Sequence, residues 1–315
     1  MTTCSEFGSA SERAAAEAFQ LDSTPLLSRS SVALSDQQRD DPEHAATLWS
    51  GGRVLPVDQR GRAPLEPSGR LAWHRPDEFS DHGGHAVLLG THDGVAHWGV
   101  RVRPRDSGAD WQGLRAVGEW LGDVEAALLT TAVGLLAWHD RARYCALCGA
   151  GTERIRSGWA RRCTGCGHEE YPRTDPSMIC LVHDGADHVL LARQVVWPAE
   201  RFSVLAGFVE MGESLEGCVS REVHEEVGVP VSDIRYLGSQ PWPFPRSLMM
   251  GFSAVADPRE PLRPAPGEIA EAHWVSREHV RAALGHEEPV DGLWLPPGIS
   301  IAHRMLRGWA DAGPV

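Results

Sequence analysis

The stretch that decides the fold runs from Gly207 to Val229 and reads GFVEMGESLEGCVSREVHEEVGV. Its second part predicts a helix from about Ser214 to Val227, because apolar residues recur there at helical spacing. Gly228 is the expected C-terminal stop of that helix. The apolar stripe consists of Leu215, Val219, Val223 and Val227.

Three glutamates follow the helical spacing on another part of this surface. Glu222, Glu225 and Glu226 stand at i, i+3 and i+4, which makes their carboxylates neighbours. A hard divalent cation, Mg²⁺ or Mn²⁺, would remove their mutual repulsion, neutralise phosphate oxygens and acidify a bound water. One carboxylate could then accept the proton of that water. For the three glutamates alone, a solvated acidic helix face is the simpler interpretation.

Neighbouring residues suit the same chemistry. Gly207 and Gly212 allow tight turns around Glu213, and the planar fork of Arg221 can hold a carboxylate. The flanking sequence alternates short apolar runs with helical segments, which predicts an α/β or α+β domain.

The whole stretch resembles the Nudix box, G-x5-E-x7-R-E-U-x-E-E-x-G-U with U aliphatic, at every fixed position. The resemblance implies the Nudix α/β/α sandwich fold and metal-dependent hydrolysis of a pyrophosphate bond. It also implies that Glu222, Glu225 and Glu226 are metal ligands or the base. Glu213 and Arg221 would support them, and the backbone carbonyl of Ala206 would complete a metal site.

A proline-rich segment follows the box. Pro241, Pro243 and Pro245 disfavour regular helix and interior strand, which holds the residues between them extended. Trp242 and Phe244 would thereby be displayed for stacking on a base or a nicotinamide ring, although simple packing in the core explains them equally well. Two further side chains, Gln240 and Ser247, offer hydrogen bonds.

The segment SQPWPFPRS, residues 239–247, is similar to the signature that follows the box in NudC-type NADH pyrophosphatases. The resemblance implies hydrolysis of NADH or NAD⁺ to NMNH or NMN plus AMP, and a homodimer. It assigns substrate contacts to Gln240, Pro241, Trp242, Pro243, Phe244, Pro245, Arg246 and Ser247. Removal of an NAD cap from RNA, hydrolysis of ADP-ribose or dinucleoside polyphosphates, and a non-catalytic nucleotide sensor are the alternatives.

The same resemblance extends to single positions outside the loop. It implies an additional metal ligand at Glu268, with Glu271 as a rival, and substrate contacts at Tyr171 and Ala302. Arg115 matches a substrate arginine of the N-terminal domain. The chain departs from the family at Gly158, where these enzymes can have a glutamate that touches substrate.

Four cysteines form two C-x2-C knuckles, each followed by glycine. Cys145, Cys148, Cys163 and Cys166 present four thiolates for a tetrahedral, structural Zn²⁺. Such a zinc ribbon also occurs in NudC-type enzymes.

Composition bounds the remaining expectations. The chain has 315 residues and a net charge of -13, which disfavours long nucleic acid as a ligand unless a local basic patch exists. No apolar stretch is long enough for a membrane span, and the first residues lack a secretory signal, so a cytoplasmic protein is expected. The predicted organisation is a weakly ordered tail (1–45), a β-rich N-terminal domain (46–140), a zinc ribbon (141–171) and a Nudix domain (172–315).

Overall fold

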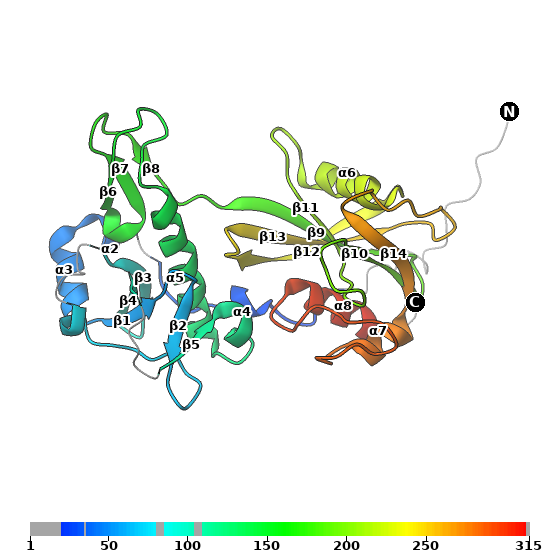
Figure 1. The fold of residues 1–315 in the computed structure, drawn as a ribbon, viewed down its shortest axis with the longest axis horizontal. Helices are drawn as coiled ribbons and strands as arrows, with labels where there is room; N and C mark the ends of the chain where they lie inside the picture. Colours follow the sequence, from blue (N-terminus) through cyan, green and yellow to red (C-terminus); the bar gives the residue numbers. More distant parts are fainter. Residues whose placement is uncertain (1–19, 35, 80–84, 104–108, 313–315) are drawn as a thin grey trace. The chain divides into compact units, whose positions relative to one another are not determined.

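The computed structural model describes residues 20–34, 36–79, 85–103 and 109–312. The chain divides into two compact units, which are described separately (Figure 1). Of the described residues, the first unit contains 20–25, 176–240 and 249–312, and we call it the catalytic unit. The second contains 26–175 and 241–248, and we call it the ribbon unit. The domain limits expected at residues 45, 140 and 171 stay predictions.

The catalytic unit is built on a six-stranded sheet. Five strands follow the order β12-β13-β9-β10-β14, and β11 pairs with β9. The pairs β9–β10, β10–β14 and β9–β11 are antiparallel. The strands are β9 (Asp175–His183), β10 (His188–Gln194), β11 (Leu205–Phe208), β12 (Ser232–Trp242), β13 (Ser247–Val255) and β14 (Ile269–Ser276).

Helices cover both faces of this sheet, α6 (Leu215–Val227) on one and α7 (Arg277–Ala283) with α8 (Ile301–Asp311) on the other (Figure 1). Strand β9 shows why. Met178 and Cys180 belong to the core under α6, whereas Ile179 and Leu181 belong to the core with α7 and α8. Successive side chains of a strand point to opposite faces, so a continuous apolar run fills both cores. The predicted α/β/α sandwich is confirmed.

The box helix begins and ends where its sequence indicates. The Ser214 hydroxyl accepts a hydrogen bond from the Gly217 N–H at 3.1 Å and caps the N-terminus. Gly228, at φ 79°, ends the helix in the left-handed conformation. Its apolar stripe packs in the core, as predicted.

The prolines after the box were expected to disfavour interior strand, and the one that lies within a strand, Pro241, is in an edge strand. Strand β12 continues through Gln240 and Pro241 to Trp242. Since β12 lies at the edge of the sheet, a residue without an N–H donor is tolerated there.

The ribbon unit is rich in strands, as predicted for its N-terminal part. Strand β4 pairs in parallel with β1 and antiparallel with β3, and β2 pairs with β5. A separate small sheet, β6-β7-β8, carries the cysteines. The strands are β1 (Arg53–Val57), β2 (Arg62–Leu65), β3 (Val87–His92), β4 (Val95–Arg101), β5 (Asp110–Gly113), β6 (Thr152–Ile155), β7 (Ala160–Cys163) and β8 (Glu169–Glu170).

Helix α5 packs on β3 and β4 of this unit. The helical elements, several of them single turns, are η1 (Leu26–Ser28), α2 (Gln37–Asp40), α3 (Pro42–Ser50), η2 (Pro76–Phe79), α4 (Leu114–Val117), α5 (Asp123–Arg141) and η3 (Arg156–Gly158).

The segment before residue 46 is more regular than the expected tail. Residues 1–19 lie outside the described residues, but α2 and the start of α3 fall within it. The Asp41 carboxylate accepts hydrogen bonds from the N–H groups of Glu43 and His44, and Pro42 occupies the first turn of α3. These are strong helix-start signals in a polar stretch.

Within the part of the chain that the structure describes, no helix combines the length and apolar character needed to cross a bilayer.

A buried histidine makes the ribbon unit sensitive to acid. His139, on α5, is 3% exposed; its Nε2 lies 2.8 Å from the Gly158 carbonyl and its Nδ1 lies 3.0 Å from Arg161 Nη1. Burial, followed by the nearby charge of Arg154, lowers the pKa of His139 to about 3. Because the unfolded chain would bind this proton near its ordinary pKa of about 6.5, the folded state loses stability as pH falls below that value.

We therefore predict that His139→Gln weakens the pH dependence of folding. Between pH 7.5 and 5.5, the loss of unfolding free energy should be about 1.4 kcal/mol smaller in the variant than in the unmodified chain. Urea denaturation at both pH values measures this difference, with the exposed His188→Gln as control. An equal loss in the His139 variant and the unmodified chain would contradict the prediction.

Candidate active site

Helix α6 places the three box glutamates in different surroundings. Glu226 is 2% exposed, Glu222 is half-buried and Glu225 is exposed. The helix packs on β11, so the inward positions carry two of the three carboxylates. The helical spacing had predicted three neighbouring carboxylates on one face of the helix. In the structure, the exposure of the three side chains differs.

Among the described residues, no cationic side chain pairs with the Glu226 carboxylate. It receives a hydrogen bond from the Ala206 N–H, but its Oε2 atom is buried with no partner among the described residues. Burial, then the carboxylates of Glu222 and Glu268, raises the pKa of Glu226 to about 8. Uncompensated carboxylates of this kind are suited to a hard divalent cation, which would supply the missing charge.

Glu222 lies directly against the backbone of β11. A Cβ atom built on Gly207 would come within 1.9 Å of the Glu222 carboxyl carbon. Glycine at position 207 leaves room for the Glu222 carboxylate. This explains on steric grounds why the box begins with glycine.

Arg221 connects the remaining box residues. Its Nε and Nη2 atoms donate to the two Glu213 oxygens, each at 2.8 Å, in a bidentate pair that lowers the pKa of Glu213 to about 2. Its Nη1 atom reaches Glu225 at 2.9 Å and Glu222 at 3.0 Å. Arg221 therefore links Glu213, in the loop before α6, to Glu222 and Glu225. We call Glu222, Glu225 and Glu226 the acidic cluster.

Glu268 and Glu271, the two candidates for the additional acidic ligand, have different electrostatic surroundings. The charge of Glu268 contributes to raising the pKa of both Glu222 and Glu226. Glu271 instead pairs with Arg193 at 2.5 Å. Glu271 is thus engaged by an arginine, and the choice of Glu268 as the additional acidic ligand stays a prediction.

The acidic cluster is less compact than the cysteine cluster. Considering the described residues, only the four cysteines bring three or more ligand atoms within 4.8 Å of one another.

Three protein families match consecutive parts of the chain. The NADH pyrophosphatase-like rudimentary NUDIX domain matches residues 42–138, the NADH pyrophosphatase zinc ribbon domain 140–171, and the NUDIX domain 173–293. The chain is 48% identical to the NAD-capped RNA hydrolase NudC of Mycobacterium tuberculosis (strain ATCC 25618 / H37Rv) over 303 residues, or 93% of this chain and 96% of that protein. The chain belongs to the NudC family of Nudix hydrolases.

A more distant relative of this Nudix hydrolase is the NAD-capped RNA hydrolase NUDT12 of Macaca fascicularis. It is 38% identical over 203 residues, which cover 62% of this chain and 44% of that protein. The similarity to the M. tuberculosis protein therefore extends well beyond the part shared with NUDT12.

In this NudC-family chain the aromatic residues after the box lie in the ribbon unit. Trp242 and Phe244 meet edge to face, with ring centroids 5.0 Å apart. The Arg115 guanidinium stacks on both rings, 4.3 Å from the Phe244 centroid and 5.4 Å from the Trp242 centroid. Arg246 pairs with Asp175 at 2.8 Å. The structure thus brings together Arg115 and the two aromatics that the sequence had singled out separately.

Gln240, to which the resemblance assigns a substrate contact, makes a hydrogen bond within the protein. It is fully buried, and its Nε2 atom donates to the Ile299 carbonyl at 2.7 Å. Position 240 alternates inward on β12, so the amide ties the strand to the segment before α8. Ser247 is also buried, at the start of β13.

Three further positions can be compared with their expected roles. Tyr171 is exposed, and its hydroxyl donates to Glu169 at 3.0 Å. Ala302 is buried in the first turn of α8. Gly158 has a φ of 88°, and a Cβ there would lie 2.4 Å from a Val87 methyl carbon. In this backbone conformation a side chain at position 158 would clash with Val87, so this position supplies no side-chain contact.

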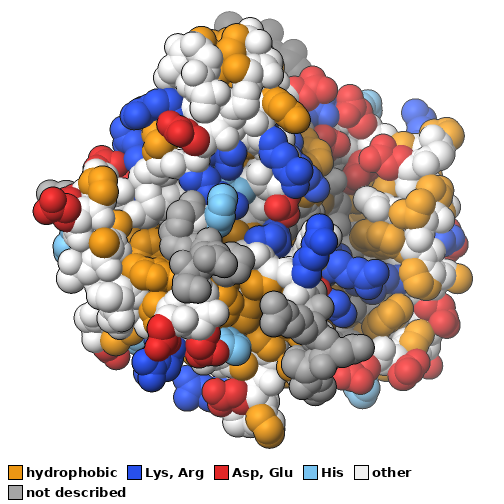
Figure 2. Space-filling model, turned by 60° about the vertical axis from the view of Figure 1, so that its left-hand side comes forward, with side chains coloured by type: hydrophobic (Ala, Val, Ile, Leu, Met, Phe, Trp, Pro, Cys, Tyr) orange, Lys and Arg blue, Asp and Glu red, His pale blue; other side chains and the backbone are white. Residues whose placement is uncertain are grey.

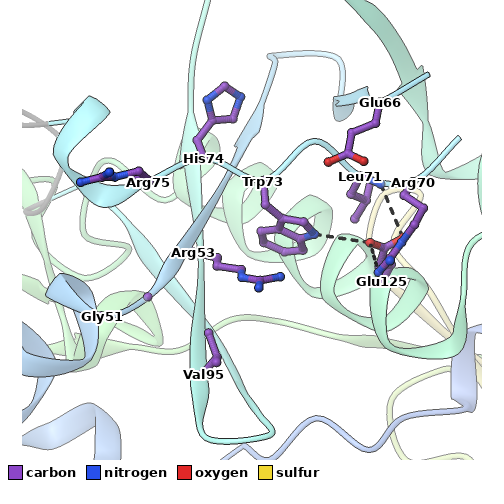
Figure 3. Close-up of a pocket in the computed structure, with 11 residues that line it drawn as sticks. Gly51, Arg53, Glu66, Arg70, Leu71, Trp73, His74, Arg75, Val95 and Glu125 are labelled. Carbon is purple, nitrogen blue, oxygen red and sulfur yellow. Dashed lines mark hydrogen bonds and ion pairs between the residues drawn. The ribbon is translucent and has the colours of Figure 1, made fainter. Parts of the chain in front are cut away.

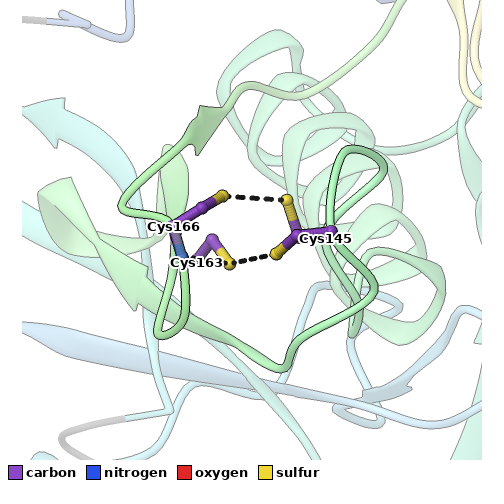
Figure 4. A group of neighbouring side chains, drawn as sticks. Cys145, Cys163 and Cys166 are labelled. Atoms are coloured by element: carbon purple, nitrogen blue, oxygen red, sulfur yellow. Dashed lines mark hydrogen bonds between the residues drawn. The ribbon is translucent and has the colours of Figure 1, made fainter.

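The four cysteines form one compact cluster (Figure 4). Cys145 and Cys166 approach to 3.7 Å between sulfurs, and Cys148 and Cys163 to 3.3 Å. The N–H groups of Gly165 and Cys166 point at the Cys163 sulfur, which lowers the pKa of that thiol. Four sulfurs with this spacing fit a tetrahedral Zn²⁺, whose sulfur ligands stand about 3.8 Å apart. The cluster is the metal site of the zinc ribbon.

A cavity of about 550 Å³ in the ribbon unit was not predicted from the sequence (Figure 3). Glu125, buried on α5, accepts hydrogen bonds there from Arg70 at 3.2 Å and Trp73 at 3.4 Å. The residues that line the cavity come from segments far apart in the chain, so no local sequence motif predicts the cavity.

We predict that Gly207→Ala inactivates the enzyme by displacing the Glu222 carboxylate. Removal of one catalytic group costs on the order of 100- to 10,000-fold in rate, and the loss should fall in that range. Steady-state hydrolysis of NADH measures it. Gly122→Ala is the control, because a Cβ there meets nothing within 4 Å. Full activity of Gly207→Ala would contradict the steric role.

A second prediction concerns the zinc ribbon. Cys166→Ser should lose the bound zinc and lower the melting temperature, because the site contributes directly to folding. Metal content by mass spectrometry and thermal unfolding measure the two effects. Cys218→Ala, outside the cluster, should retain one zinc per chain. Retention of zinc by Cys166→Ser would count against the four-cysteine site.

Proposed function

We propose that this Nudix hydrolase splits the pyrophosphate bond of NADH and NAD⁺ into NMNH or NMN plus AMP, and that it removes the NAD cap from RNA. The observation that carries the proposal is the uncompensated Glu226 carboxylate beside Glu222 and Glu268, within a complete Nudix box. The substrate class is supported by the relatives, which are named NAD-capped RNA hydrolases.

The residues proposed to hold Mg²⁺ or Mn²⁺ are Glu222, Glu225, Glu226, Glu268 and the Ala206 carbonyl. When bound, the cation supplies charge for the pyrophosphate oxygens and acidifies a water. Arg221 orients Glu225 and Glu222 while Glu213 fixes its guanidinium. One box glutamate takes the proton of the attacking water, and the buried position of Glu226 excludes competing solvent.

Substrate recognition is proposed for the segment from Gln240 to Ser247. The faces of Trp242 and Phe244 stack on a flat ring of the dinucleotide, with Arg115 as the cationic partner. Gln240 acts by holding β12, and the prolines Pro241, Pro243 and Pro245 stiffen the segment. The remaining contacts that we propose come from Arg246, Ser247, Tyr171 and Ala302.

We also propose a homodimer in the cytoplasm. Light scattering coupled to size-exclusion chromatography tests the dimer, and cell fractionation tests the compartment.

We predict that Glu226→Gln abolishes turnover without unfolding the protein, because the amide has nearly the same shape but cannot supply charge. The rate should fall on the order of 1,000-fold. Glu268→Gln should weaken metal activation, whereas the matched variant Glu271→Gln should leave it unchanged. Activity of Glu226→Gln at saturating Mg²⁺ would overturn the metal-site assignment.

The substrate is tested by a product assay. Equal concentrations of NADH, NAD⁺ and ADP-ribose are incubated separately with enzyme and Mg²⁺ or Mn²⁺, and the products are resolved by chromatography. Faster formation of NMNH and AMP supports the proposal. Faster cleavage of ADP-ribose would keep the chemistry and reject the substrate.

A further inference from the structure

The ribbon unit contains a second cavity, of about 730 Å³, where α2 and α3 meet the turn η3 and strand β7. Four arginines line it, Arg39, Arg154, Arg156 and Arg162, together with a single acidic residue, Asp40. Four arginines thus gather at one cavity although the net charge of the whole chain is -13. Figure 2, which turns this side of the molecule toward the reader, shows clusters of blue side chains on the face.

Arg154 is the arginine whose charge is least compensated. It is half-buried and donates to the His85 carbonyl, but within the described residues it forms no ion pair. Burial, followed by the charge of Arg161, lowers the pKa of Arg154 to about 10. A half-buried cation without a carboxylate partner is costly unless an anion from outside completes it.

The other arginines are held in place around it. Arg39 stacks over the Trp159 ring, 3.8 Å from its centroid. Arg162 pairs with Glu169 at 2.8 Å. Arg156 lies 3.6 Å from the same carboxylate and 3.6 Å from that of Asp40. These pairs are all partly exposed, so they are weak and leave both guanidinium groups open to a competing anion.

The backbone of η3 fixes one edge of the cavity. Arg156, Ser157 and Gly158 all have positive φ, at 53°, 50° and 88°. Non-glycine residues rarely adopt this conformation, and it persists only where the surroundings enforce it. Here the Trp159 indole N–H donates to the Leu88 carbonyl at 2.7 Å and fixes the turn on β3.

The apolar part of the wall comes mainly from α3 and the strand beneath it. Trp49 lines the cavity, and its ring meets that of Trp98 edge to face at 5.4 Å. A basic site with an aromatic wall is the combination that binds single-stranded nucleic acid: the arginines attract phosphates, and the ring offers a surface to a base.

We propose that this cavity binds the phosphates of the single-stranded RNA that follows an NAD cap. The inference rests on the proposed decapping activity and adds to it a binding site for the RNA body. Free NADH has no phosphate chain beyond its own pyrophosphate, so the cavity distinguishes capped RNA from the free dinucleotide.

The test compares two double variants that each remove two positive charges from the ribbon unit. Arg156→Ala/Arg162→Ala changes the cavity, and Arg60→Ala/Arg75→Ala changes exposed arginines elsewhere. Binding of a fluorescein-labelled, unstructured, uncapped RNA is measured by anisotropy at several salt concentrations. NADH hydrolysis and cleavage of NAD-capped RNA are measured on the same proteins.

The cavity variant should bind RNA roughly tenfold more weakly, and its salt slope should be smaller by about 1.4, as expected for two lost phosphate contacts. Its kcat/KM should fall for capped RNA and stay unchanged for NADH. Equal RNA binding by the cavity variant and the unmodified chain, an equal loss in the control, or a parallel loss of NADH hydrolysis would overturn the inference. Failure of the unmodified chain to hydrolyse NADH would reject the proposed function while leaving the RNA-binding result to stand or fall separately.

Discussion

Burial of the Glu226 carboxylate is the constraint on which the catalytic unit depends. Val223 and Val227 lie in the core under α6. Glu226 follows Val223 by three residues and therefore lies beside it on the helix surface, at the border between the apolar stripe and the glutamates, where packing on the sheet buries it as well. The chain therefore places an ionisable carboxyl group in its interior, where burial disfavours the charged form, and this is the kind of local conflict found at functional sites.

The strand beside α6 is adapted to the same constraint. Gly207 leaves space for Glu222, and the Ala206 N–H donates to Glu226. Both contacts come from β11, which pairs with the central part of β9. The sheet thus fixes the backbone that receives the carboxylates, and the helix fixes the carboxylates themselves. Rigid secondary structure on both sides keeps such a cluster in place before any cation binds.

Sequence alone could predict the parts of this design that are local. The start of the box helix near Ser214, its stop at Gly228 and the paired cysteine knuckles each depend on a few consecutive residues, and all agree with the structure. Contacts between segments that are distant in the sequence could not be predicted in this way. The burial of Gln240 and the passage of β12 through Pro241 depend on which strand lies at the sheet edge, and no local pattern encodes that position.

The two units present opposite electrostatic problems. Within the part of the chain that the structure describes, the buried Glu226 carboxylate of the catalytic unit has no cationic partner, and the half-buried Arg154 guanidinium of the ribbon unit forms no ion pair. Net charge does not reveal either, because a chain at -13 can still concentrate arginines in one cavity. An acidic balance opposes nonspecific attachment to nucleic acid along the whole surface, while a local cluster retains phosphate binding at one place. The combination suits an enzyme that must hold an RNA near its end and release it after cleavage, because weak contacts limited to one cavity keep the product from remaining bound.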